Sequence, residues 1–140
     1  MNAFIIGSPL ETAMALDKRR LNKQIVECLQ MLNAMEYKSR WSNHPCTLQY
    51  REHKHWLFDY MQCLDAYRNG DIKYAESISE RCDLMRPPFQ KEEFFNQMKR
   101  RLYTKNNKHY KQWEHLGEGN QNWYFVDGEM RVYENGKRLK

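Results

Sequence analysis

The chain has 140 residues, with 23 Lys and Arg against 18 Asp and Glu, and a formal net charge of +5. This length suits one domain, and an apolar content of 41%, which includes 14% aromatic residues, argues against intrinsic disorder. No run approaches the roughly 18 apolar residues of a membrane span, and Met1–Ile6 lacks the basic start of a secretory signal. We therefore expect a soluble cytoplasmic protein with no membrane partner.

Helical spacing begins close to the N-terminus. Ser8 and Glu11 form a capping-box pattern around Pro9, which predicts a short helix ending near Leu16. A longer helix is predicted over Lys18–Met35, because apolar residues recur there every three or four positions. The residues expected on its buried face are Leu21, Ile25, Cys28, Leu29, Leu32 and Met35.

Three more helices are predicted in the middle of the chain. The first covers His53–Arg68 and is stopped by Asn69-Gly70. The second covers Ile72–Leu84, and the proline pair Pro87-Pro88 then forces an extended break. The third covers Lys91–Tyr103.

The pattern changes near the C-terminus. Asp127-Gly128 separates two short segments of strand-forming residues, Trp123–Val126 and Glu129–Tyr133, which predicts a hairpin with a two-residue turn. Asn135-Gly136 predicts another turn before the basic end of the chain. A lone hairpin is only marginally stable in water, so this one is expected to pack on the helices or on a partner.

The expected fold class is therefore mainly α: a single compact helical domain over residues 1–116, with a small C-terminal β-hairpin extension over 117–140 packed on it. The four cysteines contain no CxxC pair, so we expect free thiols, no metal site and no cofactor. They are Cys28, Cys46, Cys63 and Cys82.

Four cations fall within six residues of the long helix: Lys18, Arg19, Arg20 and Lys23. Like charges four residues apart repel by about 0.2–0.5 kcal/mol, which favours an anionic partner such as a phosphate backbone. The alternative is a solvated basic face that Asp17 and Glu27 partly neutralise.

The loop Trp41–Pro45 carries an amide and an imidazole, on Asn43 and His44, next to a rigid proline. Such groups suit a base edge or a phosphate, and the alternative is a structural loop whose histidine caps a helix.

A second basic segment, 99–111, interleaves cations with aromatic rings, and Lys99, Arg100 and Arg101 are expected to point largely outward. Rings stack on bases while cations pair with phosphates, as single-strand or extruded-base recognition requires. The alternative is a basic helix end that the helix dipole favours.

Three motifs together resemble the pyrimidine dimer DNA glycosylase (phage endonuclease V-like) superfamily, in its bacterial and phage branch. Leu16–Glu27 follows the pattern Leu-Asp-x-x-Arg-Leu-x-Lys-Gln-x-x-Glu, residues 43–45 are Asn-His-Pro, and Lys105, His109 and Tyr110 follow Lys-x-x-x-His-Tyr. The resemblance covers about Met1–Pro45 and Arg101–Tyr110, and it implies a small helical enzyme that acts on DNA.

The resemblance also implies a mechanism in which an N-terminal α-amine forms a Schiff base with the sugar and a Glu on the first long helix assists. Asn2 is too large for efficient removal of the preceding residue, so either the amine is that of Met1 or the mechanism differs from the family's. Arg20 corresponds to the family's Glu, and Glu27 is expected to substitute for it, with Asp17 as the alternative acid.

The expected function is that of a DNA-binding N-glycosylase, with or without abasic-site lyase activity, acting on a damaged or modified base extruded from the duplex. The alternatives are a catalytically inactive DNA-binding module on the same fold and an enzyme that processes modified phage nucleotides. Trp41 or Tyr110 is expected to line the gap left by the base. The residues expected to contact DNA are Lys18, Arg19, Lys23, Gln24, Trp41, Asn43, His44, Arg100, Arg101, Lys105, His109 and Tyr110.

Overall fold

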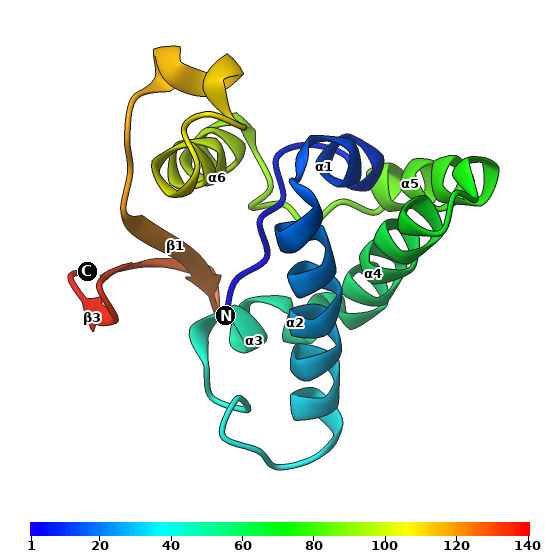
Figure 1. Ribbon diagram of the computed structural model, residues 1–140. Helices are drawn as coiled ribbons and strands as arrows, with labels where there is room; N and C mark the ends of the chain where they lie inside the picture. Colours follow the sequence, from blue (N-terminus) through cyan, green and yellow to red (C-terminus); the bar gives the residue numbers. More distant parts are fainter. The chain divides into compact units, whose positions relative to one another are not determined.

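The first two helices form where the sequence predicts them. The computed structural model describes residues 1–140. Helix α1 (Pro9–Ala15) begins after Ser8, whose hydroxyl accepts a hydrogen bond from the Glu11 N–H, while the Glu11 carboxylate accepts one from the Ser8 N–H. Helix α2 (Lys18–Glu36) follows directly and is the longest element (Figure 1). The predicted capping box is thus confirmed.

The buried face of α2 is rotated from the predicted apolar stripe. Leu29, expected in the core, is 50% exposed, so this part of the prediction was wrong. The reason is that Gln24 and Glu27 lie on the buried face. A prediction from the spacing of apolar residues does not place polar side chains there. The buried residues are Leu21, Gln24, Glu27, Cys28, Met31 and Ala34.

The remaining helices of the first half include one that the sequence analysis missed. Helix α3 (Pro45–Tyr50) starts with its proline at the first helical position and runs into the 3₁₀ turn η1 (Arg51–His53). Helix α4 (Lys54–Arg68) begins one residue after the predicted start, and α5 (Ile72–Leu84) matches its prediction.

The chain divides into two compact units, Met1–Pro87 and Pro88–Lys140, with the break at the proline pair. Helices α1 to α5 all lie in the N-terminal unit. Residues 88–116, which the sequence analysis grouped with the helical domain, lie in the second unit together with the strands.

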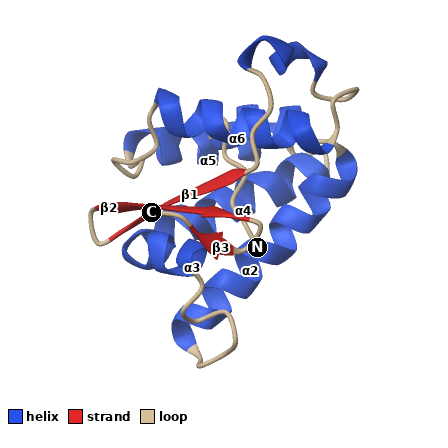
Figure 2. Ribbon diagram, turned by 90° about the vertical axis from the view of Figure 1, so that its left-hand side faces the viewer, coloured by secondary structure: helices blue, strands red, loops and turns tan.

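The second unit contains one long helix, a 3₁₀ segment and a three-stranded antiparallel sheet in the order β1-β2-β3 (Figure 2). Its elements are α6 (Glu92–Lys105), η2 (Lys111–Leu116), β1 (Gln121–Val126), β2 (Glu129–Glu134) and β3 (Lys137–Arg138). The fold class predicted from the sequence, mainly α with a small C-terminal β element, is confirmed.

Both strand connections are two-residue turns with left-handed backbone. Asp127 and Gly128 have φ of 53° and 80°, and Asn135 and Gly136 have φ of 51° and 76°. Positive φ at both positions gives the turn twist that matches paired strands, and Asn, Asp and Gly tolerate it best. The second turn adds the short strand β3, where the sequence predicts only a turn and a basic end.

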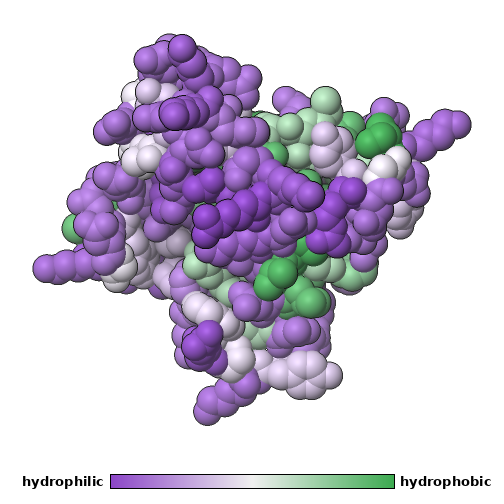
Figure 3. Space-filling view, in the orientation of Figure 1, coloured by the Kyte–Doolittle hydropathy of each residue, from purple (hydrophilic) through white to green (hydrophobic).

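Aromatic rings fill the second unit's core. Phe89 stacks on Phe125 with ring centroids 5.4 Å apart, and Phe94 meets both rings edge-on. Tyr110 stacks on Trp113, also at 5.4 Å. The face drawn in Figure 3 is mostly hydrophilic, with smaller hydrophobic patches, and none of the helices is long and apolar enough to cross a bilayer.

Candidate active site

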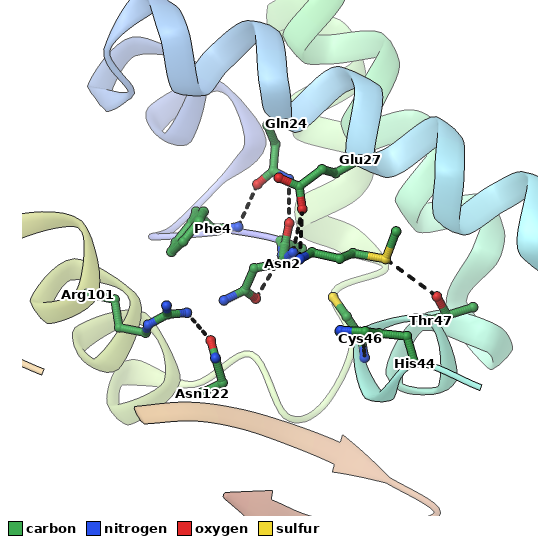
Figure 4. A network of polar contacts seen from close by, with 11 residues as sticks. Asn2, Phe4, Gln24, Glu27, His44, Cys46, Thr47, Arg101 and Asn122 are labelled. Atoms are coloured by element: carbon green, nitrogen blue, oxygen red, sulfur yellow. Dashed lines mark hydrogen bonds and ion pairs between the residues drawn. The ribbon is translucent and has the colours of Figure 1, made fainter. Parts of the chain in front are cut away.

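The first residues of the chain lie against the buried polar face of α2 (Figure 4). The Gln24 amide nitrogen donates to the Asn2 carbonyl at 2.7 Å, and the Gln24 amide oxygen accepts from the Phe4 N–H at 2.6 Å. The Gln24 side chain therefore forms hydrogen bonds to the backbone of residues 2–4, as a neighbouring strand would. These bonds hold the N-terminus beside the helix.

Glu27 lies one turn further along the same face and receives the start of the chain. Its Oε2 is 3.6 Å from the α-amine of Met1 and accepts a hydrogen bond from the Asn2 N–H at 2.6 Å. The residue is 8% exposed. A carboxylate this deeply buried is stable as an ion only when it is paired and hydrogen-bonded, and the N-terminus supplies both interactions.

The side chain of Met1 is itself part of this arrangement. It is 1% exposed, and the Thr47 hydroxyl donates to its sulfur at 3.7 Å. Thr47 follows the Asn-His-Pro sequence in α3, so this helix closes the opposite side of the N-terminal residue.

His44 and Cys46 approach the same amine from α3. His44 caps the helix, because its Nδ1 accepts the Cys46 N–H at 3.1 Å, and in the neutral ring the proton must then lie on Nε2. Burial, and then the positive charge of the N-terminus, lower the pKa of His44. Burial and the nearby Glu27 raise the pKa of the Cys46 thiol to about 12, so it stays protonated and unreactive.

Arg20 and Asp17, both predicted in catalytic roles, pair with each other. The Arg20 guanidinium donates to the Asp17 carboxylate at 3.1 Å, and both side chains are partly exposed. Glu27, and not Arg20, is the residue of α2 whose side chain contacts the α-amine. The one-turn spacing of Gln24 and Glu27 puts both on the face turned toward residues 1–4, whereas Arg20 lies a further turn back.

The remaining predicted DNA contacts of the N-terminal unit lie at or near its surface. Trp41 is partly exposed, the Arg40 guanidinium lies 4.7 Å from its ring centroid, and the His44 ring meets it edge-on at 5.9 Å. The exposed residues of the predicted set are Lys18, Arg19, Lys23 and Asn43. By contrast, Gln24 is 2% exposed and its amide is engaged with backbone.

In the second unit the predicted contacts divide into two groups. Arg100 donates to the Leu116 carbonyl at 2.9 Å, and Arg101 donates to the Asn122 side chain, so neither simply points outward as expected. Burial lowers the pKa of the Arg101 guanidinium. Tyr110 is fully buried, so its ring is not available to a base in this conformation. Lys105 and His109 are exposed, as a DNA contact requires.

Two residues around the N-terminus had no signal in the sequence analysis. The Tyr60 hydroxyl donates to the Gln24 amide oxygen at 3.2 Å, and Thr47 contacts Met1. Tyr60 fitted an ordinary amphipathic helix and Thr47 lay in a segment with no predicted element, so only packing brings them to the site.

Comparison with known proteins supports the resemblance drawn from the motifs. Residues 1–66, just under half of the chain, match the model of the family described as pyrimidine dimer DNA glycosylase. Comparisons with curated proteins and with solved structures give no match. The matched residues lie wholly in the N-terminal unit and contain every residue placed above around the α-amine of Met1.

Proposed function

We propose that this protein is a DNA glycosylase that acts on a damaged or modified pyrimidine through its N-terminal α-amine. The observation that carries the proposal is the α-amine of Met1, 3.6 Å from a buried carboxylate in the part of the chain that matches the glycosylase family. A buried acid beside a primary amine suits imine chemistry at a sugar carbon.

In this mechanism the unprotonated α-amine attacks C1′ of the extruded nucleotide. The C1′–N bond breaks, its electron pair leaves with the base, and the base takes up a proton. Glu27 stabilises the positive charge that develops on the sugar, and it lies close enough to the amine to face that charge. Opening of the sugar ring, with a proton delivered to O4′, then gives the Schiff base.

A Schiff base at C1′ also permits strand cleavage. Loss of a proton from C2′ leads to elimination of the 3′ phosphate oxygen, which is abasic-site lyase activity. The neutral His44, with its proton on Nε2, is suited to donate a hydrogen bond to the nucleotide rather than to remove a proton through that nitrogen.

Duplex DNA is the proposed partner, with Lys18, Arg19 and Lys23 contacting phosphates. Their exposure on α2 leaves them available for such contacts. Trp41 is proposed to fill or line the gap left by the base, because its ring is partly exposed and aromatic faces stack on bases.

The test is reductive trapping on two oligonucleotide duplexes, one with an abasic site and one with a pyrimidine dimer. Borohydride reduces a Schiff base to a stable amine, so a covalent protein–DNA adduct is expected, and its mass map should place the link on the first residue. Intact mass establishes whether that residue is Met1 or Asn2, since the Asn2 nitrogen also contacts Glu27.

The outcomes separate the candidate functions. An adduct on the abasic duplex, together with cleavage of a C1′–N bond of the dimer, whose base stays attached to the neighbouring pyrimidine, supports the proposal. Tight binding with a steep salt dependence, but no adduct and no base release on any lesion, would instead indicate a DNA-binding module without catalysis.

A further inference from the structure

The side-chain amide of Gln24 connects three separate segments of the N-terminal unit. Its oxygen accepts from the Phe4 N–H at 2.6 Å and from the Tyr60 hydroxyl at 3.2 Å, and its nitrogen donates to the Asn2 carbonyl at 2.7 Å. These contacts lie in the interior, because Gln24 is 2% exposed and Tyr60 is fully buried. Gln24 thus joins α2 and α4 to the start of the chain. Figure 4 draws its contacts with Asn2 and Phe4.

The partners fix the orientation of this amide. The Phe4 N–H can only donate and the Asn2 carbonyl can only accept, so the oxygen must face Phe4 and the nitrogen must face Asn2. A Glu at position 24 would place an acceptor against the Asn2 carbonyl, and a Met of similar length would pair with neither backbone group. Glutamine is therefore matched to the two backbone groups it holds.

Tyr60 is a rigid support for this arrangement. Its ring stacks on Trp56 with centroids 5.4 Å apart and an interplanar angle of 11°, and Trp56 stacks in turn on Tyr50 at 5.9 Å. The indole of Trp56 donates to the Cys82 carbonyl at 3.0 Å, which anchors the column on α5. The hydroxyl that reaches Gln24 is thus held by the core and has little freedom to move.

The segment that Gln24 holds begins one residue after the proposed nucleophile. Glu27 sits one turn beyond Gln24 on the same face, so one helix fixes both the amine's carboxylate and the backbone that carries the amine. We propose that Gln24, supported by Tyr60, is a positioning residue that sets the place of the N-terminal α-amine relative to Glu27. This inference rests on the proposed function for the reacting amine, and it gives Gln24 a role other than the predicted nucleotide contact.

The first test needs no DNA. Hydrogen exchange of the Phe4 amide is measured by NMR in the wild type, Gln24→Met and Tyr60→Phe, with Cys63→Ala as the control. Cys63 is a buried residue of α4 whose thiol contacts the Ala75 carbonyl instead of the N-terminal segment. Protection of Phe4 should fall at least about tenfold in Gln24→Met while the amides of α4 keep theirs. Unchanged protection of Phe4 would overturn the inference.

The second test measures the consequence for chemistry. In single-turnover trapping at saturating abasic duplex, Gln24→Met should lower the rate on the order of 10²-fold, because a small misplacement of a reacting group has an effect of this size. Tyr60→Phe keeps the stacked ring and should lower the rate about three- to tenfold. Cys63→Ala should trap at the wild-type rate, and the Kd for the duplex should stay within about twofold in all three variants.

These readouts separate positioning from general stability. A Gln24→Met protein that exchanges faster at Phe4 but traps at the wild-type rate would show that the amide only stabilises the fold. A rate loss matched by Cys63→Ala at equal melting temperature would show the same, and either result overturns the inference.

Failure of the proposed function gives a different result. If the wild type forms no adduct, the acetylation rate of the α-amine is measured by peptide mass spectrometry. Release of the segment in Gln24→Met should raise that rate at least about threefold, since the amine then separates from the Glu27 carboxylate that pairs with it. An unchanged acetylation rate would overturn the positioning role of Gln24 independently of the proposed function.

Discussion

Two basic segments that look alike in the sequence have different surroundings in the structure. In α2 the cations Lys18, Arg19 and Lys23 are exposed. In α6, Arg100 and Arg101 donate to a backbone carbonyl and a side-chain amide of their own unit. A cation that finds an acceptor within its unit stabilises the fold, whereas an exposed row of cations is available to a polyanion. Neighbouring acceptors, more than the number of charges, therefore decide what a basic segment does.

The interiors of the two units share stacked rings and buried amides, and the first also buries the carboxylate of Glu27. Beside the N-terminus the first unit buries polar groups that hold backbone or charge, as Gln24 and Glu27 do. The second unit also stacks rings, as Phe89 does on Phe125, and its buried Gln97 donates to the Gln121 carbonyl. Buried polar groups require pairing, and the first unit places the buried side chains of Gln24 and Glu27 together beside one amine.

The largest expected effect tests whether the chemistry belongs to the N-terminal unit. Glu27→Gln removes the charge beside the amine while keeping the shape, and it should lower the trapping rate on the order of 10²–10³-fold. Glu36→Gln is the matched control, since this acid lies on the same helix, exposed, and pairs with Lys54. Trapping at the wild-type rate in Glu27→Gln would remove Glu27 from the mechanism.

A second variant tests the structural role of the cations in α6. Arg101→Ala removes a partly buried guanidinium and its bond to Asn122, and it should lower the free energy of unfolding by about 1.5–3 kcal/mol. Arg19→Ala, on the exposed face of α2, should change it by less than about 0.5 kcal/mol. Urea unfolding measures both, and equal losses would contradict the distinction between the segments.

A third experiment compares the two segments in DNA binding. Removing Arg19 or Lys23 should reduce the slope of log Kd against log salt concentration by about 0.9 for each phosphate that the variant no longer neutralises. Arg100→Ala should leave the slope close to wild type, because this guanidinium already donates to the Leu116 carbonyl. A slope that changes in Arg100→Ala but not when Lys23 is removed would assign the DNA contact to α6 instead of α2.

The smallest expected effect concerns His44. Burial and the N-terminal charge lower its pKa in the folded state, so protonation favours unfolding. Its contribution to stability is fully present above the unfolded value of about 6.5 and is lost as pH falls through the lower folded value. His44→Asn keeps a helix-capping side chain without a titrating ring. Urea unfolding at several pH values should show that the free energy of unfolding falls less steeply in acid for this variant than for the wild type. An identical fall in both proteins would exclude His44 as the cause.

The sequence predicted the helices well because periodicity is a local property. The helix over Ile72–Leu84 matches the structure residue for residue, and Ser8 caps the first helix as expected. The short elements were not predicted, because α3 has only six residues and β3 only two, which is too few to show a period. Leu29 was misplaced because the buried face of its helix is partly polar.

The site was predicted less completely, for a physical reason. The motif residues Gln24 and Glu27 were identified from their spacing, but the spacing alone did not show that both turn toward the first residues of the chain. Tyr60 and Thr47 join them only through packing between helices distant in sequence. Residues that act through such packing leave no local pattern.

The enclosed side chain of Met1 has a practical consequence for anyone who prepares this protein. A purification tag fused ahead of Met1 would turn its α-amine into a peptide bond and remove the charge that pairs with Glu27, beside a side chain that is only 1% exposed. Lys140, at the other end, is exposed, and a tag attached there leaves the α-amine of Met1 unchanged. We expect protein tagged at the N-terminus to be inactive and less stable, and removal of the tag to leave activity only when no extra residue remains.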